Sequence, residues 1–291
     1  MAINDTIDLT LKLKDGRNLG YIDLGKKDAN RVLFHFHGFP GSRLEATMLA
    51  DRAITKNVRL IGIDRPGMGL SDFKKNRTLL DWPDDVVELA DVLGIDKFAV
   101  EGISGGGPYA AACAYKIPER LISCGIISGL ASKDLEMEKK VKLFSLIRNF
   151  PWLFKLIIWI QSRGMKDLEK AEKNMKKTII KFPGADRKVL EDPQMMSKFV
   201  KETAEGFRQG SKGAYHDGKI YANSWGFNLE DISPKLKVYI WHGDADTSVP
   251  ISMGREMCKV IPNCEGKFYP GEGHYSTIFN YYEDIINTLI S

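Results

Sequence analysis

The chain has 291 residues, of which 43% are hydrophobic and 27% are charged, close to the averages for globular proteins. This composition excludes collagen-like, mucin-like and wholly disordered chains, and the length predicts one or two domains. A net charge of +4 gives no indication of a nucleic-acid-binding surface, so no nucleic-acid partner is expected.

No sequence pattern for a metal site, an export signal or a membrane span stands out. The four cysteines lie outside any CxxC pair or zinc-ligand spacing, and we expect four free thiols. The first residues lack the basic and apolar regions of a secretory signal. The most apolar stretch, 152–160, contains Lys155 and is far shorter than the ~20 residues that span a bilayer. We therefore expect a cytoplasmic protein that needs no metal and no organic cofactor.

Short apolar runs alternate with helical patterns from residue 8 to about 130, and again from about 236 to the end. Several runs are apolar throughout, which is typical of parallel strands buried on both faces. The alternation predicts an α/β fold with a mostly parallel sheet. The expected strands are 9–14, 19–25, 31–38, 59–64, 97–104, 124–130, 237–243 and 266–271, and the expected helices between them are 79–93, 105–116, 251–261 and 276–290.

The middle of the chain, 131–231, differs in composition and in hydrophobic pattern. It is rich in Lys, Glu, Met and Leu, shows no strand pattern and is expected to be helical. We interpret it as a helical cap inserted into a core domain formed by 1–130 and 232–291. Residues 133–212 contain 19 Lys and Arg against 11 Asp and Glu, a net charge of +8 that leaves −4 for the rest. A basic cap would favour an anionic substrate.

The strongest chemical motif is Gly102-Ile103-Ser104-Gly105-Gly106, between an expected strand and an expected helix. This G-x-S-x-G pattern is typical of a nucleophile elbow, in which a sharp turn exposes the serine. The glycines are needed because a Cβ at 102 or 106 would meet the neighbouring strand and helix. The alternative is an ordinary glycine-rich loop between a strand and a helix. The segment does not match the phosphate-binding patterns, because it lacks the Lys-Ser/Thr of a P-loop and the G-x-G-x-x-G spacing.

A serine nucleophile requires a base and a group that orients the base. His274 follows the last expected strand in a Gly-Glu-Gly-His loop, which suits the base. Asp246 follows the preceding strand and is the expected acid, with Asp244 held in reserve. The order serine, aspartate, histidine is the one expected of a particular hydrolase architecture.

The segment His37-Gly38-Phe39-Pro40-Gly41-Ser42 follows the third expected strand. An oxyanion hole needs two donors aimed at one developing negative charge. We expect the backbone amides of Phe39 and Gly105 to supply them. His37 and Arg208 are further candidates for substrate contact, with an ion pair inside the cap as the alternative for Arg208.

These motifs resemble those of the α/β-hydrolase fold family. The resemblance covers about 25–130 and 232–291 and is carried by HGFPGS (37–42), DRPGMGLSD (64–72), GISGG (102–106), GDADTSVP (243–250) and GEGH (271–274). It implies an eight-stranded, mainly parallel sheet, with helices on both faces and a helical cap after the sixth strand. The loop 64–72 resembles a turn that shapes the fold near the site.

The resemblance also implies a catalytic triad of Ser104, Asp246 and His274, with an oxyanion hole from the Phe39 and Gly105 amides. The HGFP form is shared with epoxide hydrolases and haloalkane dehalogenases, whose elbow nucleophile is a carboxylate. Ser104 stands at that position here, which argues against both activities.

We therefore expect a serine hydrolase that cleaves a small ester, or related acyl substrate, through an acyl-enzyme. Amide or peptide (aminopeptidase-like) and lactone cleavage are alternatives, as is a receptor that binds a ligand without turnover. The apolar stretch 141–160, broken or kinked at Pro151, is expected to cover the crevice as a lid. Its alternative is an interfacial helix pair that touches an anionic membrane.

Overall fold

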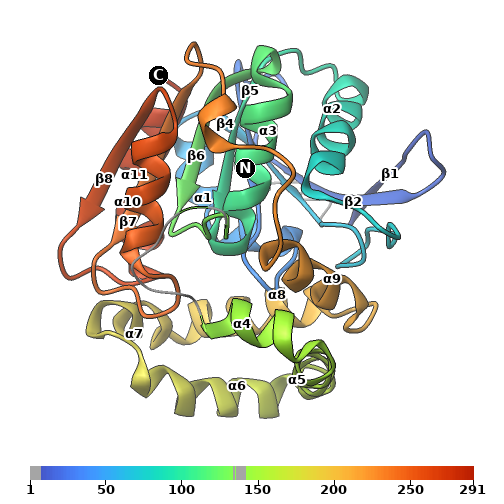
Figure 1. Ribbon diagram of the computed structural model, residues 1–291, viewed down its shortest axis with the longest axis vertical. Coiled ribbons are helices and arrows are strands. Elements are labelled where there is room, and N and C mark those ends of the chain that lie inside the picture. Colours follow the sequence, from blue (N-terminus) through green and yellow to red (C-terminus); the bar gives the residue numbers. More distant parts are fainter. Residues whose placement is uncertain (1–7, 134, 136–141) are drawn as a thin grey trace.

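Eight strands form a single sheet in the order β1-β2-β4-β3-β5-β6-β7-β8 (Figure 1). The computed structural model describes residues 8–133, 135 and 142–291. Strand β2 pairs antiparallel with β1 and β4, and the strands from β3 to β8 are mutually parallel. The strands are β1 Leu9–Lys12, β2 Asn18–Leu24, β3 Arg31–Phe36, β4 Val58–Ile63, β5 Phe98–Ile103, β6 Leu121–Ile127, β7 Lys237–Gly243 and β8 Cys264–Tyr269. The predicted mostly parallel, eight-stranded sheet is confirmed, and each predicted strand lies within three residues of an observed one.

Helices cover both faces of the sheet, because the central strands are apolar on both sides. Helices α2 (Trp82–Val92), α3 (Gly107–Lys116) and α10 (Ile251–Val260) share one buried cluster with the strands. Helices α1 (Ala50–Thr55) and α11 (Ser276–Leu289) belong to a second cluster on the other face.

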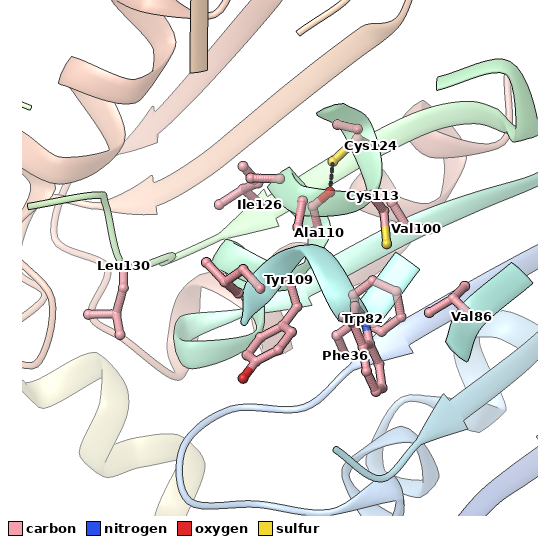
Figure 2. Close-up of a cluster of buried hydrophobic side chains, with 14 of the residues drawn as sticks. Phe36, Trp82, Val86, Val100, Tyr109, Ala110, Cys113, Cys124, Ile126 and Leu130 are labelled. Carbon is pink, nitrogen blue, oxygen red and sulfur yellow. Dashed lines mark hydrogen bonds between the residues drawn. The ribbon is translucent and has the colours of Figure 1, made fainter. Parts of the chain in front are cut away.

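Aromatic rings fix two of these helices to the sheet. Figure 2 shows Phe36 of β3, Trp82 of α2 and Tyr109 of α3 together in the first cluster. The Trp82 ring centroid lies 5.3 Å from that of Phe36 and 5.6 Å from that of Tyr109, both in edge-to-face geometry. Such pairs add to the free energy gained by burying the rings. These ring contacts hold helix α3, and the turn that precedes it, next to the ends of β3 and β5.

In the described part of the chain, six α-helices follow β6 and precede β7; we call them the cap helices. They lie at the edge of the sheet where the parallel strands end (Figure 1). Pro151 breaks the predicted stretch 141–160 into α4 and α5, and residue 141 lies outside the described part. The division into a core domain and a separate cap domain remains a prediction. The cap helices are α4 Lys142–Asn149, α5 Pro151–Gly164, α6 Leu168–Thr178, α7 Gly184–Leu190, α8 Pro193–Gly206 and α9 Lys212–Tyr221.

Backbone contacts between glycines bring two cap helices close to the core. A Cβ on Gly206, at the end of α8, would overlap the carbonyl oxygen of Gly41. A Cβ on Gly213, in α9, would overlap the carbonyl oxygen of Gly67. Only residues without side chains permit such close approach. Helices α8 and α9 are therefore seated directly on the core loops that follow β3 and β4.

A buried ion-pair network reinforces the seat of α9. Asp217 of α9 accepts a hydrogen bond from Arg65 Nε at 2.7 Å, pairs with Arg77 and accepts the hydroxyl of Tyr109 at 2.7 Å. Burial raises the pKa of Asp217, but the two guanidinium groups outweigh that effect and hold this pKa well below its usual range. The carboxylate is therefore charged and paired on both oxygens.

Candidate active site

Ser104 occupies a strained turn between β5 and α3. Its φ of +53° lies in the left-handed region, which non-glycine residues rarely adopt. A Cβ on Gly102 would overlap the Gly106 carbonyl, and a Cβ on Gly106 would overlap the Phe36 carbonyl. The steric reason predicted for these two glycines is confirmed. The turn presents Ser104 at the carboxyl ends of the parallel strands.

Asp246 and His274 meet at the ends of β7 and β8. Asp246 Oδ2 accepts a hydrogen bond from His274 Nδ1 at 2.7 Å. Its Oδ1 accepts the backbone N–H groups of Ser248 and Val249, each at 2.8 Å. The carboxylate is therefore held in one orientation by the turn in which it lies. Asp244 is exposed and accepts the Gly271 N–H at 2.7 Å, so it orders the loop that leads to His274.

The charges of this pair stabilise one another. Burial raises the pKa of Asp246, but the neighbouring His274 and His242 hold it well below its usual range. Burial alone would lower the pKa of His274, but Asp246 raises it above its ordinary value. Because Nδ1 donates to the carboxylate, Nε2 is the nitrogen that can accept a proton.

Ser104 and His274 line the same cavity, whose volume is about 50 Å³. That volume holds a few water molecules. The cap contributes to its wall through Phe199 and Glu202 of α8. The rest of the lining comes from the core and is mostly apolar, namely Gly38, Phe39, Pro40, Glu45, Met48, Leu49, Ile103, Tyr275, Ile278 and Phe279.

The two predicted oxyanion donors lie side by side. A Cβ on Gly105 would be 2.6 Å from the Cβ of Phe39, so the two residues are in contact. Gly105 belongs to the first turn of the short helix Ser104–Gly106, where N–H groups have no partner within the helix. Phe39 itself lines the cavity. That the Phe39 and Gly105 amides form an oxyanion hole remains a prediction.

A series of hydrogen-bonded ionisable side chains supports the loop that carries Phe39. The Gly38 N–H donates to Glu45 Oε2 at 2.8 Å, and His35 Nε2 bonds the same oxygen at 3.0 Å. His35 Nδ1 bonds Glu101 at 2.8 Å. Burial lowers the pKa of His35, but Glu101 and Glu45 reverse this and raise it to about 9. Protonated His35 therefore donates from both nitrogens and bridges the two carboxylates.

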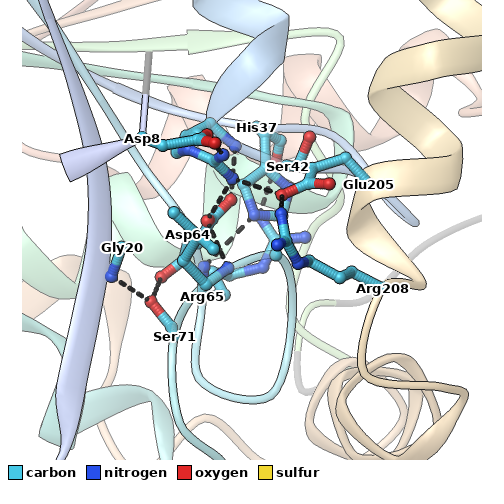
Figure 3. Close-up of polar contacts among 12 residues, drawn as sticks. Asp8, Gly20, His37, Ser42, Asp64, Arg65, Ser71, Glu205 and Arg208 are labelled. Atoms are coloured by element: carbon cyan, nitrogen blue, oxygen red, sulfur yellow. Dashed lines mark hydrogen bonds and ion pairs between the residues drawn. The ribbon is translucent and has the colours of Figure 1, made fainter. Parts of the chain in front are cut away.

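The structure places His37 and Arg208 outside this cavity lining. His37 is buried; its Nδ1 bonds the Gly38 carbonyl at 2.9 Å and its Nε2 accepts the Arg65 N–H at 3.3 Å. Arg208 is half exposed and pairs with Glu205 at 3.2 Å (Figure 3). This is the ion pair that the sequence left as the alternative for Arg208, and its contact with a substrate remains a prediction. Both side chains have structural partners.

Sequence reasoning missed a cap residue that holds the His274 loop. Asp186 of α7 is buried, and its Oδ2 accepts the His274 N–H at 2.8 Å. Its Oδ1 accepts the N–H groups of Tyr275 and Ser276, each at 2.8 Å. A Cβ on Gly273 would overlap the Asp186 carboxylate, which explains a glycine directly before the histidine. Helix α7 has a pattern typical of a solvated helix, so the sequence carries no signal for this contact.

Sequence reasoning also missed Glu45 and Glu202, which bring two carboxyl groups to the cavity. Glu202 Oε1 accepts the Ser42 N–H at 2.7 Å, across the boundary between α8 and the core. Burial and the nearby charge of Glu45 raise the pKa of Glu202 well above its usual range. Glu202 therefore joins helix α8 to the core loop after β3 at the wall of the cavity.

Among the described residues, no group of three or more His, Cys, Asp or Glu side chains is placed to hold a metal ion. The four cysteines are free thiols. Within the same part of the chain, every helix is too short or too polar to cross a membrane.

The sequence pattern of the alpha/beta hydrolase fold family matches residues 31–281. A bifunctional esterase/perhydrolase of Acinetobacter calcoaceticus is 25% identical over 273 residues, which cover 90% of this chain and 91% of that protein. An esterase from Exiguobacterium antarcticum has a similar structure, with a TM-score of 0.72 at 16% identity over 97% of this chain and 98% of that one. A hydrolase from Pseudomonas aeruginosa also gives 0.72, at 18% identity over 98% and 99%.

Proposed function

The chain belongs to the alpha/beta hydrolase fold family, and we propose that it is a serine hydrolase that cleaves a small ester or related acyl substrate. One observation carries the proposal. Ser104, on its strained turn, lines the same cavity as His274, whose ring is hydrogen-bonded to the buried Asp246. A base oriented by a carboxylate in the same cavity supports activation of the serine hydroxyl.

In the proposed reaction, Ser104 Oγ attacks the substrate carbonyl carbon while His274 Nε2 takes the hydroxyl proton. The N–H groups of Phe39 and Gly105 bind the oxyanion that forms. Collapse of this intermediate expels the alcohol, which receives the proton from His274, and leaves an acyl group on Ser104. Water then attacks the acyl-enzyme with His274 again as base, and the acid is released. Asp246 keeps His274 in the tautomer whose Nε2 can accept a proton.

Two observations favour a small ester over a bulky substrate or an amide. The cavity of about 50 Å³ leaves little room for a long acyl chain. The Acinetobacter relative, which spans nearly the whole chain, is named an esterase. Amide, peptide or lactone cleavage would use the same residues, so substrate comparison must separate them.

The test compares wild type with Ser104→Ala on p-nitrophenyl acetate. Wild type should give steady turnover, and Ser104→Ala should lose nearly all of it while its circular dichroism spectrum is unchanged. Ser252→Ala is the matched control, because the Ser252 hydroxyl lies in α10 without a hydrogen-bond partner among the described residues. Undiminished hydrolysis by Ser104→Ala would refute the nucleophile. A single burst followed by stalling would favour the receptor alternative.

A further inference from the structure

Large hydrophobic side chains are exposed in one place far more than elsewhere. Among the described residues, ten such side chains are exposed, and six of them lie between Phe150 and Ile160. Trp152 is 66% exposed and Trp159 is 48% exposed. We call these six side chains the α5 apolar surface: Phe150, Trp152, Leu156, Ile157, Trp159 and Ile160. Single exposed hydrophobic residues are ordinary, but a contiguous group indicates an interaction site.

The opposite side of α5 is already packed. Phe154 and Ile158, one turn apart, are buried. The Phe154 ring lies 5.9 Å from the ring of Tyr215 in α9, and a Cβ on Gly218 would overlap Phe154. Because α9 is itself held to the core through Asp217, the orientation of α5 is fixed. The α5 apolar surface therefore faces away from its own protein.

Positive charge surrounds this surface. From Arg148 to Lys166 the sequence contains four cationic residues and no carboxylate. All four cations, Arg148, Lys155, Arg163 and Lys166, are exposed. The Arg163 guanidinium lies 5.3 Å from the Trp159 ring centroid. Helix α6 adds further exposed cations, Lys170, Lys173, Lys176 and Lys177.

We propose that the α5 apolar surface docks on an anionic phospholipid bilayer. Tryptophan is the side chain that membrane–water interfaces favour, and flanking cations are attracted to anionic headgroups. Helix α5 has 14 residues, so it would lie in the plane of the interface rather than cross the bilayer. It belongs with α6 to the side of the cap away from the sheet (Figure 1), where the core does not obstruct a flat surface.

The charge distribution favours a membrane over a second copy of the chain. Residues 133–212 carry 19 basic and 11 acidic residues, a net +8. Two copies that met through α5 would bring two strongly basic caps together, which is electrostatically unfavourable. An anionic bilayer instead complements the charge and buries the same apolar side chains. This inference does not depend on the proposed hydrolysis, because none of the six side chains lines the catalytic cavity.

The experiment measures cosedimentation with vesicles of phosphatidylcholine alone, or mixed equally with phosphatidylglycerol. Wild type should bind the mixed vesicles about tenfold more tightly than the neutral ones, with binding weakened by salt. The double variant Trp152→Ser/Trp159→Ser should bind the mixed vesicles at least about tenfold more weakly than wild type does. Lys155→Glu/Arg163→Glu should lose the preference for phosphatidylglycerol.

Matched controls separate docking from folding and from catalysis. Val92→Ser/Ile122→Ser removes two exposed side chains on the core and should bind like wild type. Ser104→Ala should also bind like wild type, whatever it does to hydrolysis. The tryptophan variant should keep its circular dichroism spectrum and its turnover of a soluble ester.

Three results would overturn the proposal. Wild type that fails to sediment with the mixed vesicles would refute membrane docking. Full binding by the tryptophan double variant would show that the α5 apolar surface is not the contact. A wild-type dimer in sedimentation equilibrium that the same double variant dissociates would assign the surface to a second copy of the chain.

Discussion

The carboxylate of Asp186, in the cap, accepts the backbone N–H of His274 at 2.8 Å. The same carboxylate accepts the next two N–H groups, at the start of α11. A buried anion thus ties helix α7 to the loop that carries the proposed base. The position of His274 depends on the cap as well as on the sheet, and the charge of Asp186 helps to raise the pKa of His274.

Asp186→Asn should weaken both the hold on the loop that carries His274 and the rise in the pKa of His274. The amide retains one acceptor oxygen and introduces N–H donors where backbone donors already point, so the free energy of unfolding should fall by about 1–3 kcal/mol. We expect kcat to fall by up to about 100-fold, since small displacements of a catalytic group are costly. The pH midpoint of kcat/KM should also move to lower pH, which a purely structural loss would not cause.

Glu191→Gln, an exposed change near the end of the same helix, is the control and should leave all three quantities unchanged. If Asp186→Asn kept the wild-type pH midpoint and kcat, its proposed influence on His274 would be refuted.

The pH dependence of the reaction should reflect a His274 with a raised pKa. A general base works only when unprotonated, so kcat/KM should increase with pH through the pKa of His274 in the free enzyme. Because Asp246 raises that pKa, the midpoint should lie above the ordinary histidine value of about 6.5. The measurement is kcat/KM for p-nitrophenyl acetate as a function of pH.

Asp246→Asn should move this midpoint to lower pH and reduce kcat by about 10⁴. Asp244→Asn should have far smaller effects, because Asp244 is exposed and its carboxylate accepts only the Gly271 N–H among the described contacts. Equal losses in the two variants would contradict the choice of Asp246 as the acid.

Asp217→Asn should destabilise the protein strongly. The change leaves Arg65 and Arg77 buried without their anion, and breaking such a network costs about 3–5 kcal/mol. Urea denaturation followed by circular dichroism would measure this loss in the free energy of unfolding. Asp84→Asn breaks an exposed pair with Lys116 and should cost about 1 kcal/mol or less. Comparable losses for both variants would show that the buried network does not hold the cap to the core.

Met48→Ala should broaden the range of acyl chains. Met48 lines the small cavity, so its truncation makes room for added methylene groups, each worth about tenfold or more in discrimination. The ratio of kcat/KM for the butyrate and acetate esters should therefore rise by about tenfold. Met257→Ala, buried in α10 away from the cavity, should leave the ratio unchanged. An unchanged ratio in Met48→Ala would place the acyl group elsewhere.

The strands were predictable because buried parallel strands leave continuous apolar runs, and the pairing of Asp246 with His274 followed from motifs at the ends of two strands. Ser104 was recognisable because its turn requires glycines on both sides. Each of these signals lies within a short stretch of sequence, and the resemblance of the motifs to those of known hydrolases added to them.

Asp186 and Glu202 could not be predicted in the same way. Their helices carry several other charged residues, and nothing local separates a carboxylate that turns inward from one that faces solvent. Their partners lie 88 and 160 residues away in the sequence. The Arg208–Glu205 ion pair, by contrast, was foreseen as an alternative, because the two residues lie one turn apart in the sequence.

The central claim, that Ser104 is an activated nucleophile, is tested most directly by reaction with a fluorophosphonate followed by intact-mass analysis. We predict one adduct per folded chain, located on Ser104 by peptide mapping, absent in Ser104→Ala and formed far more slowly in Asp246→Asn. A folded protein that forms no adduct, or forms it on another residue, would contradict the account.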